Sequence, residues 1–196
     1  ACLTAGKADR AVRVFQKLTE LEPDAPENWC SFGDGWLAAG EPAQAETAYN
    51  KAGEIDRAAE TLFFSRLADG LLSAGYPERA TAVWERCLAV RSDEPFSWMG
   101  LGDGLIRLGK PDAAAEAYSR AADLRPLAAG GVWNRLGHCL TKEGLHAHAA
   151  AAFAKAIAAE PENPLYSLHL AESYAAQGRD DLAAGALRRA QNLMNP

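Results

Sequence analysis

A period of 34 or 35 residues constrains the fold of this chain more than any other feature. Glycines recur with successive spacings, by subtraction, of 34, 35, 34, 35 and 34 residues, at Gly6, Gly40, Gly75, Gly109, Gly144 and Gly178. An alanine follows five residues after each glycine, at Ala11, Ala45, Ala80, Ala114, Ala149 and Ala183. Four residues further on stands a bulky residue: Phe15, Tyr49, Trp84, Tyr118, Phe153 and Leu187. Because three positions keep one period, the chain is predicted to repeat a single structural unit.

The residue types at these positions predict a helix, a tight turn and a second helix. Each glycine ends a stretch with helical apolar spacing, where a left-handed residue closes a helix at little steric cost. Pro42, Pro77 and Pro111 stand two residues after their glycines, where proline favours the first turn of a helix. Two helices joined so closely pack antiparallel, and the alanine allows their backbones to approach beside the aromatic residue.

The stretch from Trp98 to Pro126 carries the pattern in full, and it resembles the tetratricopeptide repeat, W-x2-L-G-x2-Y…A-x3-F…P. The matching residues here are Trp98, Leu101, Gly102, Leu105, Ala114, Tyr118 and Pro126. Neighbouring units match with Trp29, Phe32, Gly33 and Trp36, with Phe64, Leu67, Ala68 and Leu71, and with Trp133, Leu136, Gly137 and Leu140. The sixth unit departs, with Ser167 and Leu187 at the two aromatic positions, and the second and third units close with Arg57 and Ser92 in place of proline.

The resemblance implies an all-α fold: a right-handed superhelical solenoid of antiparallel helix pairs with about five and a half repeats. We expect one array over residues 1–196, with repeats at 1–25 (partial), 26–60, 61–94, 95–129, 130–163 and 164–196. The first repeat is incomplete because Gly6 is expected to mark its turn, so the chain is expected to be a piece of a longer protein. The extra residue in two of the spacings, near Glu60 and Ala129, is expected to lie in a connection.

Composition excludes several classes of partner. The net charge of −6 argues against sequence-independent attraction to nucleic acid or to an anionic membrane surface. No apolar run approaches the roughly 20 residues that span a bilayer, and residues 1–10 lack the apolar core of a signal peptide. We favour a cytoplasmic location, although the sequence leaves the compartment unknown. The cysteines Cys2, Cys30, Cys87 and Cys139 form no CxxC pair, which favours reduced thiols packed as small hydrophobic residues.

No motif predicts catalysis, a cofactor or a metal. The stretch Gly104–Lys110 reads GxxxxGK, as in a phosphate-binding loop, but Pro111 replaces the Ser or Thr, and the same glycines recur in other repeats. Four histidines lie between His138 and His169, but the spacing of His146 and His148 points them to different faces of a helix. We therefore predict no enzymatic activity, no cofactor and no metal site.

Helical phase predicts which face of the array binds a partner. In the fourth repeat Trp98, Leu101 and Leu105 share one side of the first helix, and Trp98 is expected to be buried between helices. The opposite side should line the inner surface of the solenoid, where such arrays form concave binding grooves. A column of mainly acidic residues runs along it, at Asp34, Asp69, Asp103, His138 and Glu172. The complete predicted groove is Asp34, Leu37, Leu62, Asp69, Leu72, Phe96, Met99, Asp103, Ile106, Arg107, His138, Lys142 and Glu172.

Two interpretations of this column remain open. The acids either solvate the exposed side of each helix, or they select a partner segment that combines basic and apolar side chains. Family members that grip acidic C-terminal tails use Lys, Arg and Asn on this surface, and those residue types are missing here at Asp34, Asp69 and Asp103. Arg107 and Lys142 flank the column and could reach carboxylates of a ligand.

The leading functional hypothesis is a non-enzymatic scaffold that holds another protein or peptide segment in the groove. One alternative is the substrate-recognition or regulatory region of a larger enzyme, such as a transferase that contains these repeats. A second alternative is a structural solenoid that self-associates through its open repeat ends.

Overall fold

The computed structural model describes the backbone of residues 2–195 and the side chains of residues 6–195, and every regular element in that range is a helix. The helices are α1 (Cys2–Leu21), α2 (Pro26–Ala38), α3 (Pro42–Ile55), α4 (Glu60–Ser73), α5 (Pro77–Val90), α6 (Pro95–Arg107), α7 (Pro111–Leu124), η1 (Pro126–Ala128), α8 (Ala129–Lys142), α9 (His146–Ala159), α10 (Pro164–Ala175) and α11 (Asp180–Met194). None of these helices is long and apolar enough to cross a membrane.

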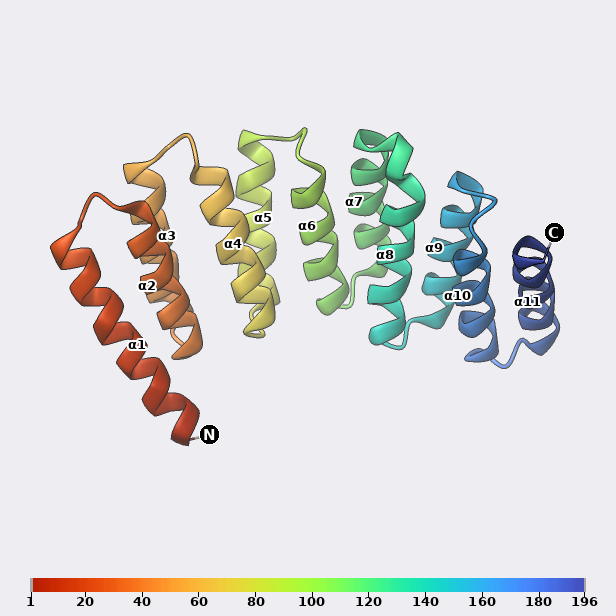
Figure 1. The fold of residues 1–196 in the computed structure, drawn as a ribbon, viewed down its shortest axis with the longest axis horizontal. Coiled ribbons are helices and arrows are strands. Elements are labelled where there is room, and N and C mark those ends of the chain that lie inside the picture. The colour runs from red at the N-terminus through yellow and green to blue at the C-terminus, as the bar shows by residue number, and fades with distance from the viewer. Residues whose placement is uncertain (1, 196) are drawn as a thin grey trace. The chain divides into compact units, whose positions relative to one another are not determined.

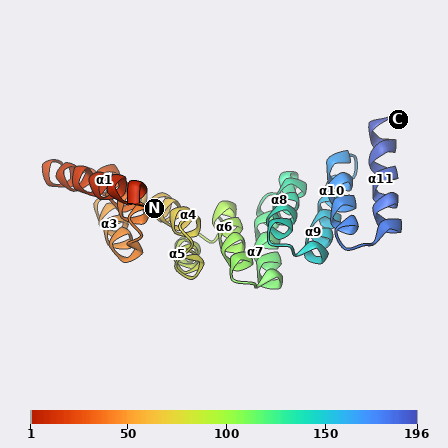
Figure 2. The same cartoon turned by 90° about the horizontal axis from the view of Figure 1, so that it is seen from below.

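The chain divides into two compact units, residues 1–92 and residues 93–196. The first unit contains α1 to α5 and the second contains α6 to α11. Within each unit consecutive helices run antiparallel and side by side (Figure 1). In the second unit α6 and α8 lie on one side and α7 and α9 on the other (Figure 2), so the first and second helices of the repeats form two layers. The predicted all-α fold of paired antiparallel helices is confirmed.

The predicted glycine turns are present at five of the six positions. Gly40, Gly75, Gly109, Gly144 and Gly178 have φ between 68° and 87°, a range that favours glycine. At the first of these turns the Glu41 N–H donates to the Trp36 carbonyl at 2.9 Å and the Gly40 N–H donates to the Leu37 carbonyl at 3.0 Å. These two bonds satisfy carbonyls at the helix end. Pro42, Pro77 and Pro111 begin the next helices, as predicted.

The turn predicted at Gly6 was wrong, because Gly6 lies inside the continuous helix α1. Gly6 is absent from the glycines with positive φ, so α1 continues through this position without a left-handed residue. The side chains of residues 2–5, including Cys2, lie outside the described residues.

The extra residues in the spacing were also misplaced. The helices α4 and α8 have 14 residues, whereas α2 and α6 have 13. The additional residue therefore extends the start of the first helix of a repeat, at Glu60 and at Ala129, and does not lengthen the connection before it.

In three repeats, the second, fourth and fifth, an aromatic ring from the second helix packs against a glycine of the first helix. Tyr118 of α7 is fully buried. A Cβ added to Gly102 of α6 would lie 2.5 Å from the Tyr118 ring. The same distance separates such an atom on Gly33 from the ring of Tyr49. The tyrosine ring therefore occupies the space that a side chain at the glycine position would need.

The prediction that Trp98 is buried was wrong in degree. Trp98 is partly buried and packs against the core of the second unit. Two residues assigned to the open face of the same helix are more deeply buried: Met99 is 5% exposed and Ile106 is 3% exposed. The helix α6 packs against α7 and also against α8. The helical phase of α6 predicts only which residues face α7. Because α8 also packs against α6, fewer residues of α6 are exposed than the phase predicts.

The packing of glycine against an aromatic ring gives a testable prediction. We expect Gly102→Ala to lower the free energy of unfolding by about 1–3 kcal/mol, because the new methyl group overlaps the Tyr118 ring. The control is Gly131→Ala in α8, where an added Cβ meets nothing within 4 Å. That change should be neutral or stabilising, by up to about 1 kcal/mol. Urea unfolding followed by circular dichroism measures both, and equal effects would contradict this packing.

Candidate functional site

The acid of the predicted column in the second repeat, Asp34, is held by side chains from two other helices. The Tyr49 hydroxyl of α3 donates to Oδ1 of Asp34 at 2.5 Å, and the Arg66 guanidinium of α4 donates to Oδ2. Arg66 also lies 3.5 Å from the Glu27 carboxylate. Asp34 therefore joins its own repeat to the next one.

The same three residue types meet two repeats later. The Tyr118 hydroxyl donates to Oδ1 of Asp103 at 2.5 Å, and Nη2 of Arg135 in α8 donates to Oδ2 at 2.6 Å. The Cys139 thiol adds a third donor at 3.3 Å from Oδ1. We call Asp34, Tyr49 and Arg66 the first junction triad, and Asp103, Tyr118 and Arg135 the second junction triad.

Burial and the aspartate charge shift the titration of the groups in these triads. Burial, with the Asp103 charge, raises the pKa of Tyr118 well above its usual range. The pKa of Arg135 is raised as well, because its hydrogen bond to Asp103 and the charge of that carboxylate outweigh desolvation. Burial and the Asp103 charge raise the pKa of Cys139 to about 11. At neutral pH the Cys139 thiol is therefore a protonated donor and not a nucleophile.

Histidines replace the ionic triad one repeat further on. His138, Phe153 and His169 lie at the positions of Asp103, Tyr118 and Arg135. The two imidazole rings are 4.4 Å apart between centroids, and His138 is 5.4 Å from the Phe153 ring. Nδ1 of His169 lies 2.9 Å from the Asn134 side-chain oxygen. This junction is therefore built from ring packing, without the ion pair.

The structure distributes the predicted groove residues among three levels of burial. Seven are exposed: Leu62, Asp69, Phe96, Arg107, His138, Lys142 and Glu172. Three are partly buried, Asp34, Leu72 and Asp103, and three are buried, Leu37, Met99 and Ile106. Met99 and Ile106 belong to the hydrophobic core of the second unit, so they are not available to line a groove.

The charges of the predicted groove are partly used within the protein. Asp34 and Asp103 accept from arginines of the following repeat, and Arg107 forms an ion pair with Glu143 at 3.1 Å. Glu172 is exposed on α10. The column is therefore not a uniform line of acids facing solvent, and its role in selecting a partner stays a prediction.

Sequence reasoning missed the junction residues, namely Tyr49, Arg66, Tyr118 and Arg135. The signal was present, since the second and fourth units share Gly-Asp-Gly while the third and fifth share Arg-Leu. The two motifs alternate because each aspartate pairs with the arginine of the repeat that follows it. The two partners are 32 residues apart in the sequence, so a pattern confined to one helix does not reveal that they pair.

A model of the tetratricopeptide repeat matches residues 3–61, 65–129, 99–164 and 134–193 of the chain. No curated protein matches the chain. Among solved structures, MamA from Desulfovibrio magneticus RS-1 is 18% identical, with a TM-score of 0.59 over 87% of this chain and 96% of that chain. YrrB, described as a TPR protein with an unusual peptide-binding site, is 21% identical, with a TM-score of 0.55 over 93% of each chain. BtubC from P. vanneervenii is 18% identical, with a TM-score of 0.58 over 97% of this chain and 89% of that chain.

The second junction triad should contribute to stability. We expect Asp103→Asn to lower the free energy of unfolding by about 1.5–3 kcal/mol, because three donors lose a charged acceptor. Asp112→Asn is the matched control, since that side chain is 95% exposed. Among the described residues, its one ion-pair contact is with the His148 ring, at 3.6 Å. Urea unfolding at pH 7 measures both variants. Losses of equal size would show that Asp103 is only a solvated surface acid.

The histidine junction should weaken in acid. Desolvation and the neighbouring His138 lower the pKa of His169 from its ordinary 6.5, against the opposing charge of Glu172. The unfolded chain then binds the proton more readily, so this contribution to stability is complete above pH 6.5 and is lost as the pH falls below it. We expect unfolding measurements at pH 7.5 and 5.5 to show a smaller acid loss in His169→Gln than in the unmodified chain. An identical acid loss in the two proteins would contradict this assignment.

Proposed function

Because the chain belongs to the tetratricopeptide-repeat family, we propose that it is a non-enzymatic scaffold that binds a protein or peptide segment. Stacked repeats present extended surfaces on which a partner can lie. YrrB, a TPR protein with an unusual peptide-binding site, has the same fold, which supports this proposal without extending that site to our chain.

The finer proposal concerns the face formed by the first helices of the second unit. The observation that carries it is the exposure of large apolar side chains there, beginning with Phe96, which is 59% exposed on α6. Leu165 on α10 is 54% exposed. Apolar side chains at this exposure favour contact with a partner, and the exposed Glu172 favours a basic side chain nearby. We therefore propose a partner segment of mixed apolar and basic character.

The junction triads refine this proposal. Asp34 and Asp103 hold successive repeats together, so their first contribution to binding is to fix the spacing of the exposed side chains. A rigid spacing of anchors lowers the cost of ordering the surface when a partner binds. Selection of a partner by charge then depends on exposed acids such as Glu172 and not on Asp34 and Asp103, which are paired within the protein.

Self-association is the alternative with a specific observation in its favour. Leu187 of α11 is 43% exposed, at the position where Tyr118 and Phe153 of earlier repeats are buried. A second copy or a further segment could cover it. A monomeric mass at every concentration in light scattering would exclude the second copy.

Selection of binding peptides from a random library, with the whole chain as bait, tests the proposed function. We expect the selected peptides to combine apolar residues with Lys or Arg. Glu172→Lys should weaken their binding by about tenfold, the effect of one like-charge contact of about 1–2 kcal/mol. Glu116→Lys, an equal charge change on the exposed side of α7, is the control. Acidic peptides, or equal binding to both variants, would contradict the proposal.

A further inference from the structure

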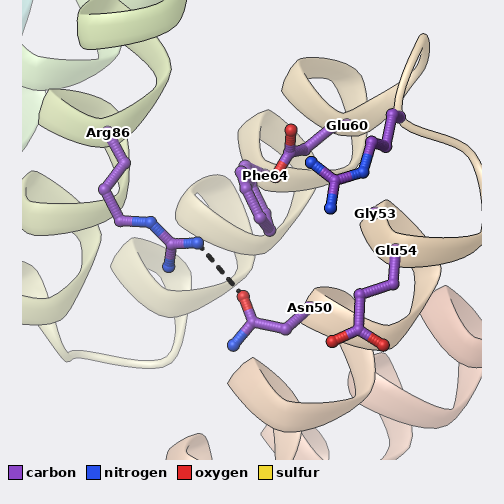
Figure 3. A pocket seen from close by; sticks show the side chains of 7 residues that line it. Asn50, Gly53, Glu54, Glu60, Phe64 and Arg86 are labelled. Atoms are coloured by element: carbon purple, nitrogen blue, oxygen red, sulfur yellow. Dashed lines mark hydrogen bonds between the residues drawn. The ribbon is translucent and has the colours of Figure 1, made fainter.

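A polar cleft of about 290 Å³ opens in the first unit, and none of its lining residues belongs to the predicted groove. It lies where α3 ends and α4 begins, and one side chain of α5 closes its side (Figure 3). The lining residues are Asn50, Gly53, Glu54, Arg57, Glu60, Phe64 and Arg86.

Three lining residues differ from the pattern that most of the repeats share. Gly53 stands where later repeats carry larger residues, Leu88, Ala122 and Ile157. Arg57 stands where other repeats have a proline, Pro23, Pro126 and Pro161. Glu60 is the extra first residue of α4. Departures from an otherwise consistent pattern indicate sites with a role other than folding.

The backbone does not require an arginine at position 57. Asp56, the preceding residue, has φ −125° and ψ 90°. Glu160, which precedes Pro161, has φ −134° and ψ 79°. Because the two conformations are alike, the residue before position 57 has backbone angles that a following proline accepts. The conformation of Asp56 therefore does not by itself select arginine over proline at position 57.

Neither guanidinium group of the cleft forms an ion pair with a carboxylate among the residues that the structure describes. Arg86 lies over the Phe64 ring at 4.3 Å from its centroid, and its Nη2 donates to the neutral Asn50 oxygen at 3.2 Å (Figure 3). Arg57 forms no ion pair with any residue that the structure describes. Glu54, in contrast, is already paired with Lys51 at 3.0 Å.

The remaining acid has a different use. The Glu60 side chain crosses the space above Gly53, since a Cβ built on that glycine would lie 3.1 Å from Cγ of Glu60. The absent side chain of Gly53 thus leaves room for the Glu60 side chain at the edge of the cleft. A carboxylate at this place can accept a hydrogen bond from a backbone N–H of a bound segment.

We propose that this cleft binds the carboxylate of an acidic side chain in a partner segment. The guanidinium groups of Arg57 and Arg86 hold the carboxylate, which matches their paired donors. Glu60 accepts an N–H of the same segment, which distinguishes a peptide from a free organic acid. This site is independent of the predicted groove and would remain if the groove proposal failed.

The test uses the whole chain and three probes: acetyl-Ser-Glu-Glu-Ser-amide, its Gln-Gln counterpart, and glutarate as a free dicarboxylate. The readout is the NMR shift of the arginine Nε–Hε signals and the Asn50 side-chain amide at low salt. We expect the Glu-Glu peptide to produce saturable shifts of Arg57 and Arg86, and the Gln-Gln peptide to produce none. Added salt should weaken the binding, as for any exposed ionic contact.

Two variants restore the repeat pattern and should remain folded. Arg57→Pro removes one guanidinium and should weaken binding by about tenfold or more. Gly53→Leu fills the cleft with the residue found at Leu88 of the next repeat and should abolish the shifts. Arg120→Gln is the charge-matched control, because Arg120 is exposed at the position of Arg86 one repeat later, and it should change nothing.

The outcomes separate the alternatives. Loss of binding in Arg57→Pro and Gly53→Leu, with full binding in Arg120→Gln, supports the proposal. Equal binding to all variants, or shifts that do not saturate, would overturn it. Stronger binding of glutarate than of the Glu-Glu peptide would overturn the partner segment as occupant.

Discussion

The contact between a glycine of the first helix and an aromatic ring of the second helix determines how the second, fourth and fifth repeats are built. The Tyr118 ring fills the volume that a side chain at Gly102 would take, and the ring is fully buried. The contact sets the distance between the two helices of a repeat. It also places the Tyr118 hydroxyl at the far side of the pair, 2.5 Å from Asp103. The packing within a repeat therefore positions the polar contact that joins it to the next repeat.

The same three positions form the junctions between repeats, in one case with an ion pair and in another with packed rings. Asp103 accepts from Tyr118 and Arg135, whereas the corresponding junction one repeat later packs His138 against Phe153 and His169. The ionic form joins a carboxylate to a guanidinium group, whereas we expect the imidazole form to weaken in acid. An array of similar repeats can thus contain junctions of different strength, which matters for a scaffold whose binding surface is assembled from several repeats.

Two surfaces with different chemistry follow from the same repeat. The first helices expose apolar residues such as Phe96 and Leu165, which suit a segment rich in apolar side chains. The cleft at Arg57 and Arg86 arises where the repeat pattern is interrupted, and it favours a carboxylate.

The helices, their antiparallel pairing and the five turns could be predicted from the sequence, because glycine, proline and aromatic positions act locally and recur with one period. Two of the residues that match the repeat motif, Tyr118 and Leu136, are buried in the core. Other features arise only when the repeats stack. Whether Met99 is exposed depends on a second neighbouring helix that phase within one helix cannot represent. Whether Asp103 is a solvated acid or a junction residue depends on Arg135, which stands 32 residues away in the sequence. The fold repeats because local rules repeat, but the role of each charge is set by the neighbour that stacking brings to it.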